Sequence, residues 1–214
     1  MLMILLELLL VVGIEVADRL GFIFLTPNPI LVLLAWISLR LRGLRWRDVG
    51  LTRPPNWPRA IAIGVVAGVA MELFSVFVTV PFFTRITGAP PDLSNFRSLV
   101  GNLRLTLLML VPMWLLAGFG EEMIYRGYVM NRVAELGRGT RAAWIASLIV
   151  VSMYFGWVHG DQKITGMVQE AFAGLLLGIL YLACRRNLTI PIVAHGVSNT
   201  MAFMLIYFDR YPGV

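Results

Sequence analysis

The chain has 214 residues, of which 58% are hydrophobic and only 14% are charged, and its mean hydropathy is +0.79. A soluble domain carries about 25% charged residues, so this composition leaves too little polar surface to coat a globule in water. The net charge of +6 comes almost entirely from arginines in short connectors between apolar runs, which indicates membrane topology and argues against a nucleic-acid partner. The single cysteine, Cys184, excludes an internal disulfide and a cysteine-rich metal site.

Apolar segments follow one another along the whole chain. A helix of about 20 apolar residues crosses a hydrocarbon core of about 30 Å. The sequence therefore predicts an all-α polytopic transmembrane bundle of about seven spans, with six to eight as the range, in a single integral membrane domain over residues 1–214. The segments are 2–17, 22–41, 58–80, 104–136, 141–160, 164–184 and 188–208.

The ends and connectors indicate how the chain is oriented. The N-terminus lacks a basic region and a small-residue cleavage site, so residues 2–17 are predicted to be a retained first helix. If the basic connector 40–59 is cytoplasmic, twelve of the 18 basic residues lie on that side. We expect the N-terminus and the active site to face the cytoplasm, in a prokaryotic plasma membrane.

Glycines indicate turns and close packing. Residues 137–139, with the sequence Gly-Arg-Gly, are predicted to form the turn between the fourth and fifth helices. The pairs Gly64–Gly68 and Gly174–Gly178 have the spacing with which small residues allow membrane helices to approach.

Charged residues within apolar segments are costly in a membrane, so each is a functional hypothesis. The densest cluster is GFGEEMIYRGYV, in which Glu122 and Arg126 are four residues apart and form an expected ion pair on one helix face. This pair alone is equally consistent with a purely structural role. Glu121 points about 100° away and lacks that partner, and a carboxylate in such a setting can act as a base near neutral pH.

Both histidines of the chain lie in short apolar motifs. Phe155 and His159 share a face of YFGWVHG, and His195 and Asn199 share a face of AHGVSN. A lone histidine at a helix end or a lone asparagine is usually structural, but an imidazole and a carboxamide on one face can both donate to an oxyanion.

Distances along the helices test whether these groups converge. Glu121 lies 17 residues before Arg138 and His159 lies 21 after it, so the two lie within about 6 Å of the same height in an antiparallel hairpin. His195 should lie shallower unless the 137–139 turn protrudes.

Together, EEMIYR at 121–126, FGWVH at 155–159 and HGVSN at 195–199 resemble the CPBP family, named for CAAX proteases and bacteriocin-processing enzymes and also called Abi. The pattern is EExxxR, FxxxH and HxxxN in order on successive late helices, and the resemblance covers about residues 104–208. It implies a helical bundle of about eight helices, with 104–208 as the catalytic core.

The resemblance also implies a reaction class. Glu121 with His159 would activate a water for attack on a peptide bond, and His195 with Asn199 would hold the oxyanion. Glu122 and Arg126 would position the site. The expected substrate is a prenylated, CAAX-type or otherwise membrane-anchored protein, and no cofactor is expected.

Three alternatives stay open at this point. Zinc could be held by Glu121, His159 and His195, although the chain has no HExxH motif. A proton-coupled transporter is suggested by further carboxylates in apolar segments, and a non-catalytic scaffold or bacteriocin-immunity protein would keep the same frame. Those further carboxylates are Glu7, Glu15, Glu72 and Glu170.

Overall fold

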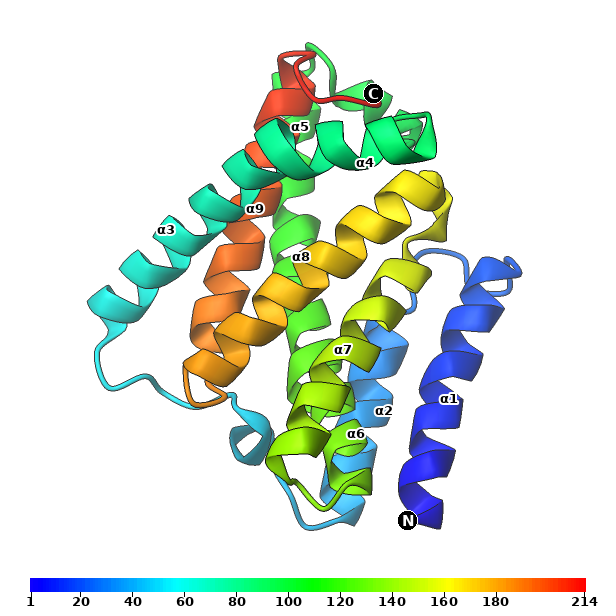
Figure 1. Ribbon diagram of the computed structural model, residues 1–214, viewed down its shortest axis with the longest axis vertical. Helices are drawn as coiled ribbons and strands as arrows, with labels where there is room; N and C mark the ends of the chain where they lie inside the picture. Colours follow the sequence, from blue (N-terminus) through cyan, green and yellow to red (C-terminus); the bar gives the residue numbers. More distant parts are fainter.

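The computed structural model describes residues 1–214 and contains helices and turns but no strand, as predicted (Figure 1). The elements in chain order are α1 (Leu2–Arg19), α2 (Asn28–Leu41), the 3-10 turn η1 (Trp46–Val49), α3 (Trp57–Phe74), the π-helix η2 (Ser75–Thr79), α4 (Val80–Thr87), the 3-10 turn η3 (Ser94–Leu99), α5 (Leu103–Pro112), the π-helix η4 (Met113–Val129), α6 (Met130–Leu136), α7 (Arg141–Val158), the 3-10 turn η5 (Gly160–Gln162), α8 (Lys163–Ala183) and α9 (Thr189–Tyr207).

Five helical stretches are long and apolar enough to cross a membrane. The first two segments fall short of that standard, because α1 carries four charged residues and α2 has only 14 residues. Two predicted boundaries are wrong: the second helix begins at Asn28 rather than at 22, and the third continues to Thr87 rather than ending near 80. The five stretches are Trp57–Thr87, Leu103–Leu136, Arg141–Val158, Gly160–Ala183 and Thr189–Tyr207.

The outer surface of the bundle is apolar. Large side chains such as Leu9, Val66, Phe77, Leu115 and Met153 are more than half exposed. Such a surface is stable against lipid and not against water. The chain is therefore an integral membrane protein.

Local sequence explains where the long helices start and bend. The side chains of Asn56, Asn102 and Thr140 accept hydrogen bonds from backbone N–H groups three residues later, at the starts of α3, α5 and α7. The chain changes direction between α3 and α4, where η2 precedes Pro81 (Figure 1). Prolines and π-turns are the usual causes of such kinks.

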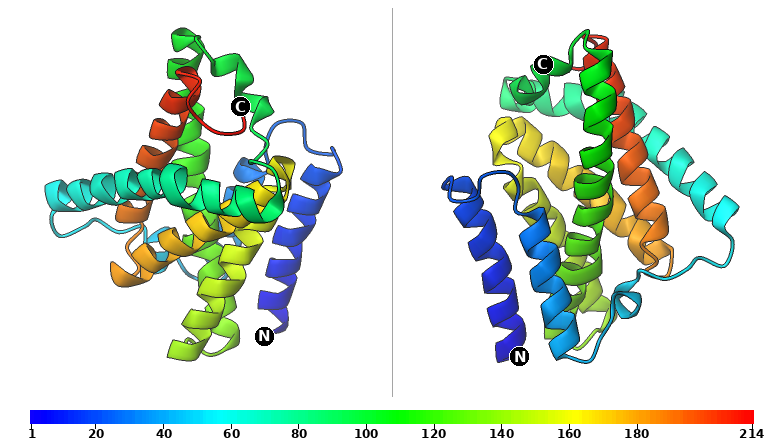
Figure 2. Two further views of the ribbon diagram at one scale, coloured as in Figure 1. Left: turned by 45° about the horizontal axis from the view of Figure 1, so that its top comes forward. Right: turned by 180° about the vertical axis from the view of Figure 1, so that it is seen from behind.

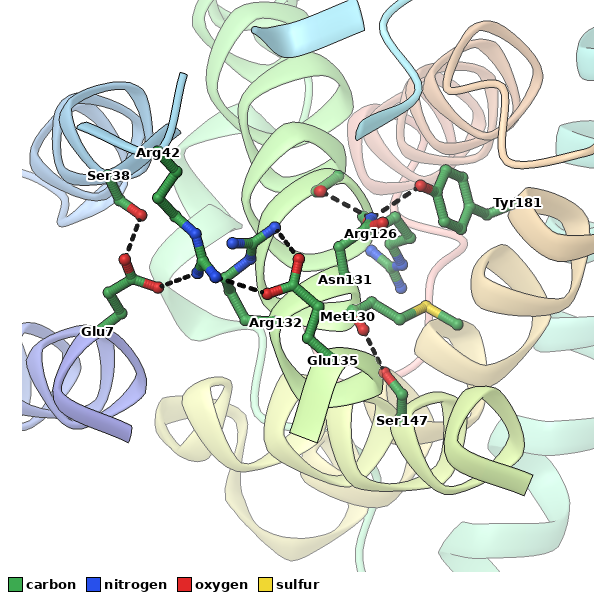
Figure 3. A network of polar contacts seen from close by, with 11 residues as sticks. Glu7, Ser38, Arg42, Arg126, Met130, Asn131, Arg132, Glu135, Ser147 and Tyr181 are labelled. Carbon is green, nitrogen blue, oxygen red and sulfur yellow. Dashed lines mark hydrogen bonds and ion pairs between the residues drawn. The ribbon is translucent and has the colours of Figure 1, made fainter. Parts of the chain in front are cut away.

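A network of ion pairs joins α1, α2 and α6 near the N-terminus (Figure 3). Glu7 accepts hydrogen bonds from Ser38 (2.7 Å) and Arg42 (3.1 Å), and Arg42 also contacts Glu135 at 2.9 Å. The buried Arg132 lies 2.6 Å from Glu135 on the next turn of α6. Glu7, one of the carboxylates that suggested a transporter, therefore has a structural role.

A second set of polar contacts ties α6 to α7, α8 and the basic connector (Figure 3). Asn131 donates to the Tyr181 hydroxyl at 2.9 Å, and Tyr181 donates to the backbone oxygen of Val49 at 3.0 Å. The Ser147 hydroxyl donates to the backbone oxygen of Met130 at 2.6 Å. These bonds fix the end of the bundle at which the N-terminus lies.

Glycines allow the closest helix packing, as the spacing predicts. A Cβ atom at Gly68 would lie 2.4 Å from the backbone oxygen of Ala194, and one at Gly64 would lie 2.6 Å from the Cβ of Val193. These contacts bring α3 against α9. Gly174 faces Phe155 in the same way, which brings α8 against α7.

We predict that Gly68→Val lowers the free energy of unfolding by about 1–3 kcal/mol, because the added methyl groups have no space against the α9 backbone. The matched control is Gly13→Val, since a Cβ at Gly13 meets nothing within 4 Å. Thermal unfolding in detergent micelles compares the two. Equal melting temperatures would contradict the packing described for α3 and α9.

Candidate active site

The first motif lies in an unusual helix. Residues Met113–Val129 form a π-helix of 17 residues, which begins directly after Pro112 and carries Glu121, Glu122 and Arg126. Such helices are rare, usually one turn long, and often occur at functional sites. Adjacent residues here still point in different directions, so Glu121 faces a cavity while Glu122 is fully buried.

Glu122 and Arg126 form the ion pair predicted from their spacing. Arg126 Nη1 lies 2.7 Å from Glu122 Oε1, and Arg126 Nη2 donates to the backbone oxygen of Gly174 at 3.0 Å. The guanidinium also lies over the ring of Phe155, 4.6 Å from its centroid. The pair therefore fixes η4 against α8 and α7.

His195 joins the same carboxylate. Its Nδ1 lies 2.9 Å from Glu122 Oε1, the oxygen that also receives Arg126. Close packing next to His195 makes this contact possible, since a Cβ at Gly118 would lie 3.2 Å from the Cα of Gly196. Because Nδ1 is engaged, Nε2 is the ring nitrogen left available to the cavity.

His159 is the residue that ends α7. Its Nδ1 lies 2.7 Å from the backbone oxygen of Phe155, and its ring centroid lies 4.7 Å from that of Phe155. A carbonyl oxygen can only accept, so Nδ1 carries the proton and Nε2 has a free lone pair when the ring is neutral. His159 is thus oriented as a base or as a hydrogen-bond acceptor.

One cavity of about 970 Å³ brings together Glu121, His159, His195 and Asn199. Glu122 and Arg126 do not line it. The ion pair lies behind His195 instead. Four polar groups from η4, the end of α7 and α9 therefore line the cavity, and the buried Glu122–Arg126 ion pair lies behind them.

The depth mismatch of His195 is resolved by the shape of the bundle. The turn between α6 and α7 extends well beyond the connection between α8 and α9 (Figure 1). His195 therefore lies at the level of Glu121 although it is only a few residues into its helix, and both line the same cavity.

The cavity lies toward the end of the bundle that carries the C-terminus. Its lining includes Asn95 of the loop before α5, Gln162 between α7 and α8, and Tyr211 of the C-terminal tail. These segments lie at the opposite end from the N-terminus (Figures 1 and 2). The cavity therefore lies nearer the end of the bundle opposite the N-terminus (Figure 1).

A salt bridge holds the loop before α5 close to the cavity. Lys163 Nζ, at the start of α8, lies 2.6 Å from Asp92 Oδ2. The hydrogen bond from this ammonium group holds the pKa of the Asp92 carboxyl well below its usual value. The pair anchors the loop that contributes Asn95 to the lining.

Another carboxylate lies behind the first motif. Tyr125 donates to Glu15 of α1 at 2.7 Å, and its ring packs edge-on against Phe155 with centroids 5.0 Å apart. Glu15 therefore positions α1 against the site and does not line the cavity. Like Glu7, it no longer supports a transporter.

The zinc alternative requires Glu121, His159 and His195 to meet at one ion. The structure does not bring these or any other three His, Cys, Asp or Glu side chains into a group suited to a metal ion.

The sequence motifs did not identify three further residues that line the cavity, which are Gln169, Ser198 and Tyr211. Serine, glutamine and tyrosine in apolar helices or tails carry no motif that could have identified them.

Comparison with known proteins agrees with the motifs. A family model described as type II CAAX prenyl endopeptidase Rce1-like matches residues 103–201, which include all three motifs. No curated protein matches the chain. No solved structure matches it either. The resemblance predicted from the motifs is confirmed: residues 103–201 are similar to type II CAAX prenyl endopeptidase Rce1-like proteins.

Proposed function

We propose that the protein is a glutamate-dependent intramembrane endopeptidase that hydrolyses a peptide bond of a prenylated or otherwise membrane-anchored protein. The observation that carries this proposal is the convergence of Glu121, His159, His195 and Asn199 on one cavity. The family supports the reaction class. The apolar part of the lining, which includes Phe96, suits a lipid chain or an apolar peptide segment.

The first step of the proposed reaction is proton transfer from water. The Glu121 carboxylate takes one proton while the water oxygen attacks the scissile carbonyl carbon, and His159 Nε2 accepts the other water hydrogen as a hydrogen bond. Attack makes a tetrahedral intermediate whose oxygen is negative. The carboxylic acid of Glu121 then gives its proton to the departing amine as the C–N bond breaks, so the carboxylate is regenerated.

The negative oxygen of the tetrahedral intermediate must be stabilised by hydrogen-bond donors. Asn199 supplies an amide N–H, four residues and one helical turn after His195. For His195 Nε2 to donate while Nδ1 donates to Glu122, the ring must carry both protons. The Glu122 carboxylate, whose Oε1 lies 2.9 Å from His195 Nδ1, is the group that would balance the positive charge of this ring.

We also propose an orientation. The positive-inside rule favours a cytoplasmic N-terminus, because the connectors at that end carry most of the arginines. The cavity then faces the opposite side of the membrane. The membrane in question is proposed to be a prokaryotic plasma membrane.

Glu121→Gln should lower kcat/KM for a farnesylated CAAX-terminated reporter by at least about 100-fold, because an amide cannot take the proton of water. The assay uses purified protein in lipid, with and without a chelator. Asp209→Asn is the control and should keep full activity, because Asp209 is exposed and does not line the cavity.

Three outcomes of this assay are informative. Full activity of Glu121→Gln would contradict water activation by Glu121. Chelator-sensitive cleavage would restore the zinc alternative. If the wild-type protein cleaves neither this reporter nor bacteriocin-type peptides, a non-catalytic scaffold would be favoured.

Glu122→Gln should behave differently, because it removes the charge that both Arg126 and His195 contact. An uncompensated buried arginine costs about 3–5 kcal/mol. We therefore expect a lower melting temperature as well as lost activity, whereas Glu121→Gln, whose side chain makes no protein hydrogen bond, should melt like the wild type. Equal melting of the Glu122→Gln and wild-type proteins would contradict the structural role of the ion pair.

Single-cysteine labelling tests the orientation. In a Cys184→Ser background, cysteine is placed at Arg138 in the α6–α7 turn or at Asn95 in the loop beside the cavity, both of which are exposed. A membrane-impermeant maleimide added to intact cells should label the Asn95→Cys protein and leave the Arg138→Cys protein unlabelled. The reverse pattern would place the cavity in the cytoplasm.

A further inference from the structure

One wall of the cavity is polar although none of its residues is a defining position of the three motifs. Glu72 comes from α3, Gln169 and Glu170 come from α8, Ser198 comes from α9, and Tyr211 comes from the C-terminal tail. The residues of this wall, which we call the acidic wall, are not needed for the proposed proton transfers. Their presence in an otherwise largely apolar cavity requires another explanation.

Glu72 is buried, and only one of its two carboxylate oxygens has a hydrogen-bond partner. The residue is only 4% exposed, and Oε2 accepts a hydrogen bond from the Ser198 hydroxyl at 2.7 Å. Its other oxygen, Oε1, has no hydrogen-bond partner. A buried carboxylate oxygen without a partner is costly, so such an atom in a cavity wall indicates a donor that arrives with a ligand.

Gln169 presents a second unused acceptor. The residue is 8% exposed, and its Nε2 donates to the Ser75 hydroxyl at 2.8 Å and to the Tyr211 hydroxyl at 3.3 Å. These bonds hold the amide with Oε1 unpartnered. Both free atoms of the wall are acceptors, so the ligand group that fits must be a donor.

The charge of the cavity indicates that this donor is cationic. The lining holds four carboxylates, from Glu72, Glu121, Asp161 and Glu170, and neither lysine nor arginine. The chain as a whole has 18 basic residues, so their absence from the lining is not a matter of composition. Carboxylates in a low-dielectric cleft concentrate cations and repel anions.

We propose that Glu72, Gln169 and Glu170 form a subsite that binds a basic side chain of the substrate, such as a lysine ammonium group. An ammonium group has three donors and no acceptor, which matches two carboxylates and one amide oxygen. The proposal rests on the proposed function, since the subsite shares the cavity with Glu121 and His159. It makes the preferred substrate a protein with a lysine or arginine close to the scissile bond.

Binding is measured with the Glu121→Gln protein in lipid nanodiscs, so that no cleavage is needed. The probes are two fluorescent farnesylated peptides that differ only in one residue near the CAAX cysteine, lysine in one and acetyl-lysine in the other. We expect the lysine peptide to bind about tenfold or more tightly, and high salt to reduce the difference.

Variants of the wall assign the effect to the subsite. When Glu72→Gln or Glu170→Gln is added to the Glu121→Gln protein, most of the preference for the lysine peptide should disappear. The affinity for the acetyl-lysine peptide should stay unchanged. Glu72→Gln keeps an oxygen that can accept from Ser198, and its melting temperature reports whether it folds. Adding Asp209→Asn should leave the preference intact. Equal affinity for the two peptides, or a preference that survives both variants, would overturn the subsite.

The outcome is separable from that of the peptidase assay. A lysine preference in binding, with no cleavage of either peptide by the wild-type protein, would keep the subsite and reject the peptidase. Cleavage that depends on Glu121 but shows no lysine preference in rate or binding would keep the peptidase and reject the subsite.

Discussion

The candidate site depends on one carboxylate oxygen. Glu122 Oε1 lies 2.7 Å from Arg126 Nη1 and 2.9 Å from His195 Nδ1, with all three side chains buried. A buried charge must be paired, so the sequence can carry Glu122 in the membrane only if Arg126 and His195 are where the structure has them. The carboxylate therefore fixes the ring of His195 relative to η4, and with it the position of Asn199 one turn further along α9.

The same constraint explains the packing around it. Arg126 reaches the backbone of Gly174 in α8, and the residue next to His195 is Gly196, which lets α9 lie directly against η4. Larger residues at either glycine would separate the elements that the ion pair joins. The close packing and the polar contacts are thus two parts of one arrangement, and Glu121 can face the cavity because its neighbour faces away from it.

Much of this arrangement is readable from the sequence. The apolar runs predict the helices, the spacing of Glu122 and Arg126 predicts their ion pair, and the order of the three motifs predicts the family. What sequence could not show depends on contacts between distant segments. The π-helix after Pro112, the protruding α6–α7 turn that brings His195 level with Glu121, and the acidic wall that Tyr211 completes all depend on tertiary packing. Motif spacing fixes the depth of a residue only relative to a turn, so it does not set the side of the membrane that the cavity faces.

The central claim is that a water molecule activated by Glu121 attacks the peptide bond directly. Cleavage of the reporter in ¹⁸O-enriched water, followed by mass spectrometry of the product and of the peptide containing Glu121, tests it most directly. The account predicts one ¹⁸O atom in the new C-terminal carboxylate of the product and none in Glu121 after many turnovers. Incorporation of ¹⁸O into Glu121 would show that its carboxylate attacks as a nucleophile, and this result would contradict direct attack by water.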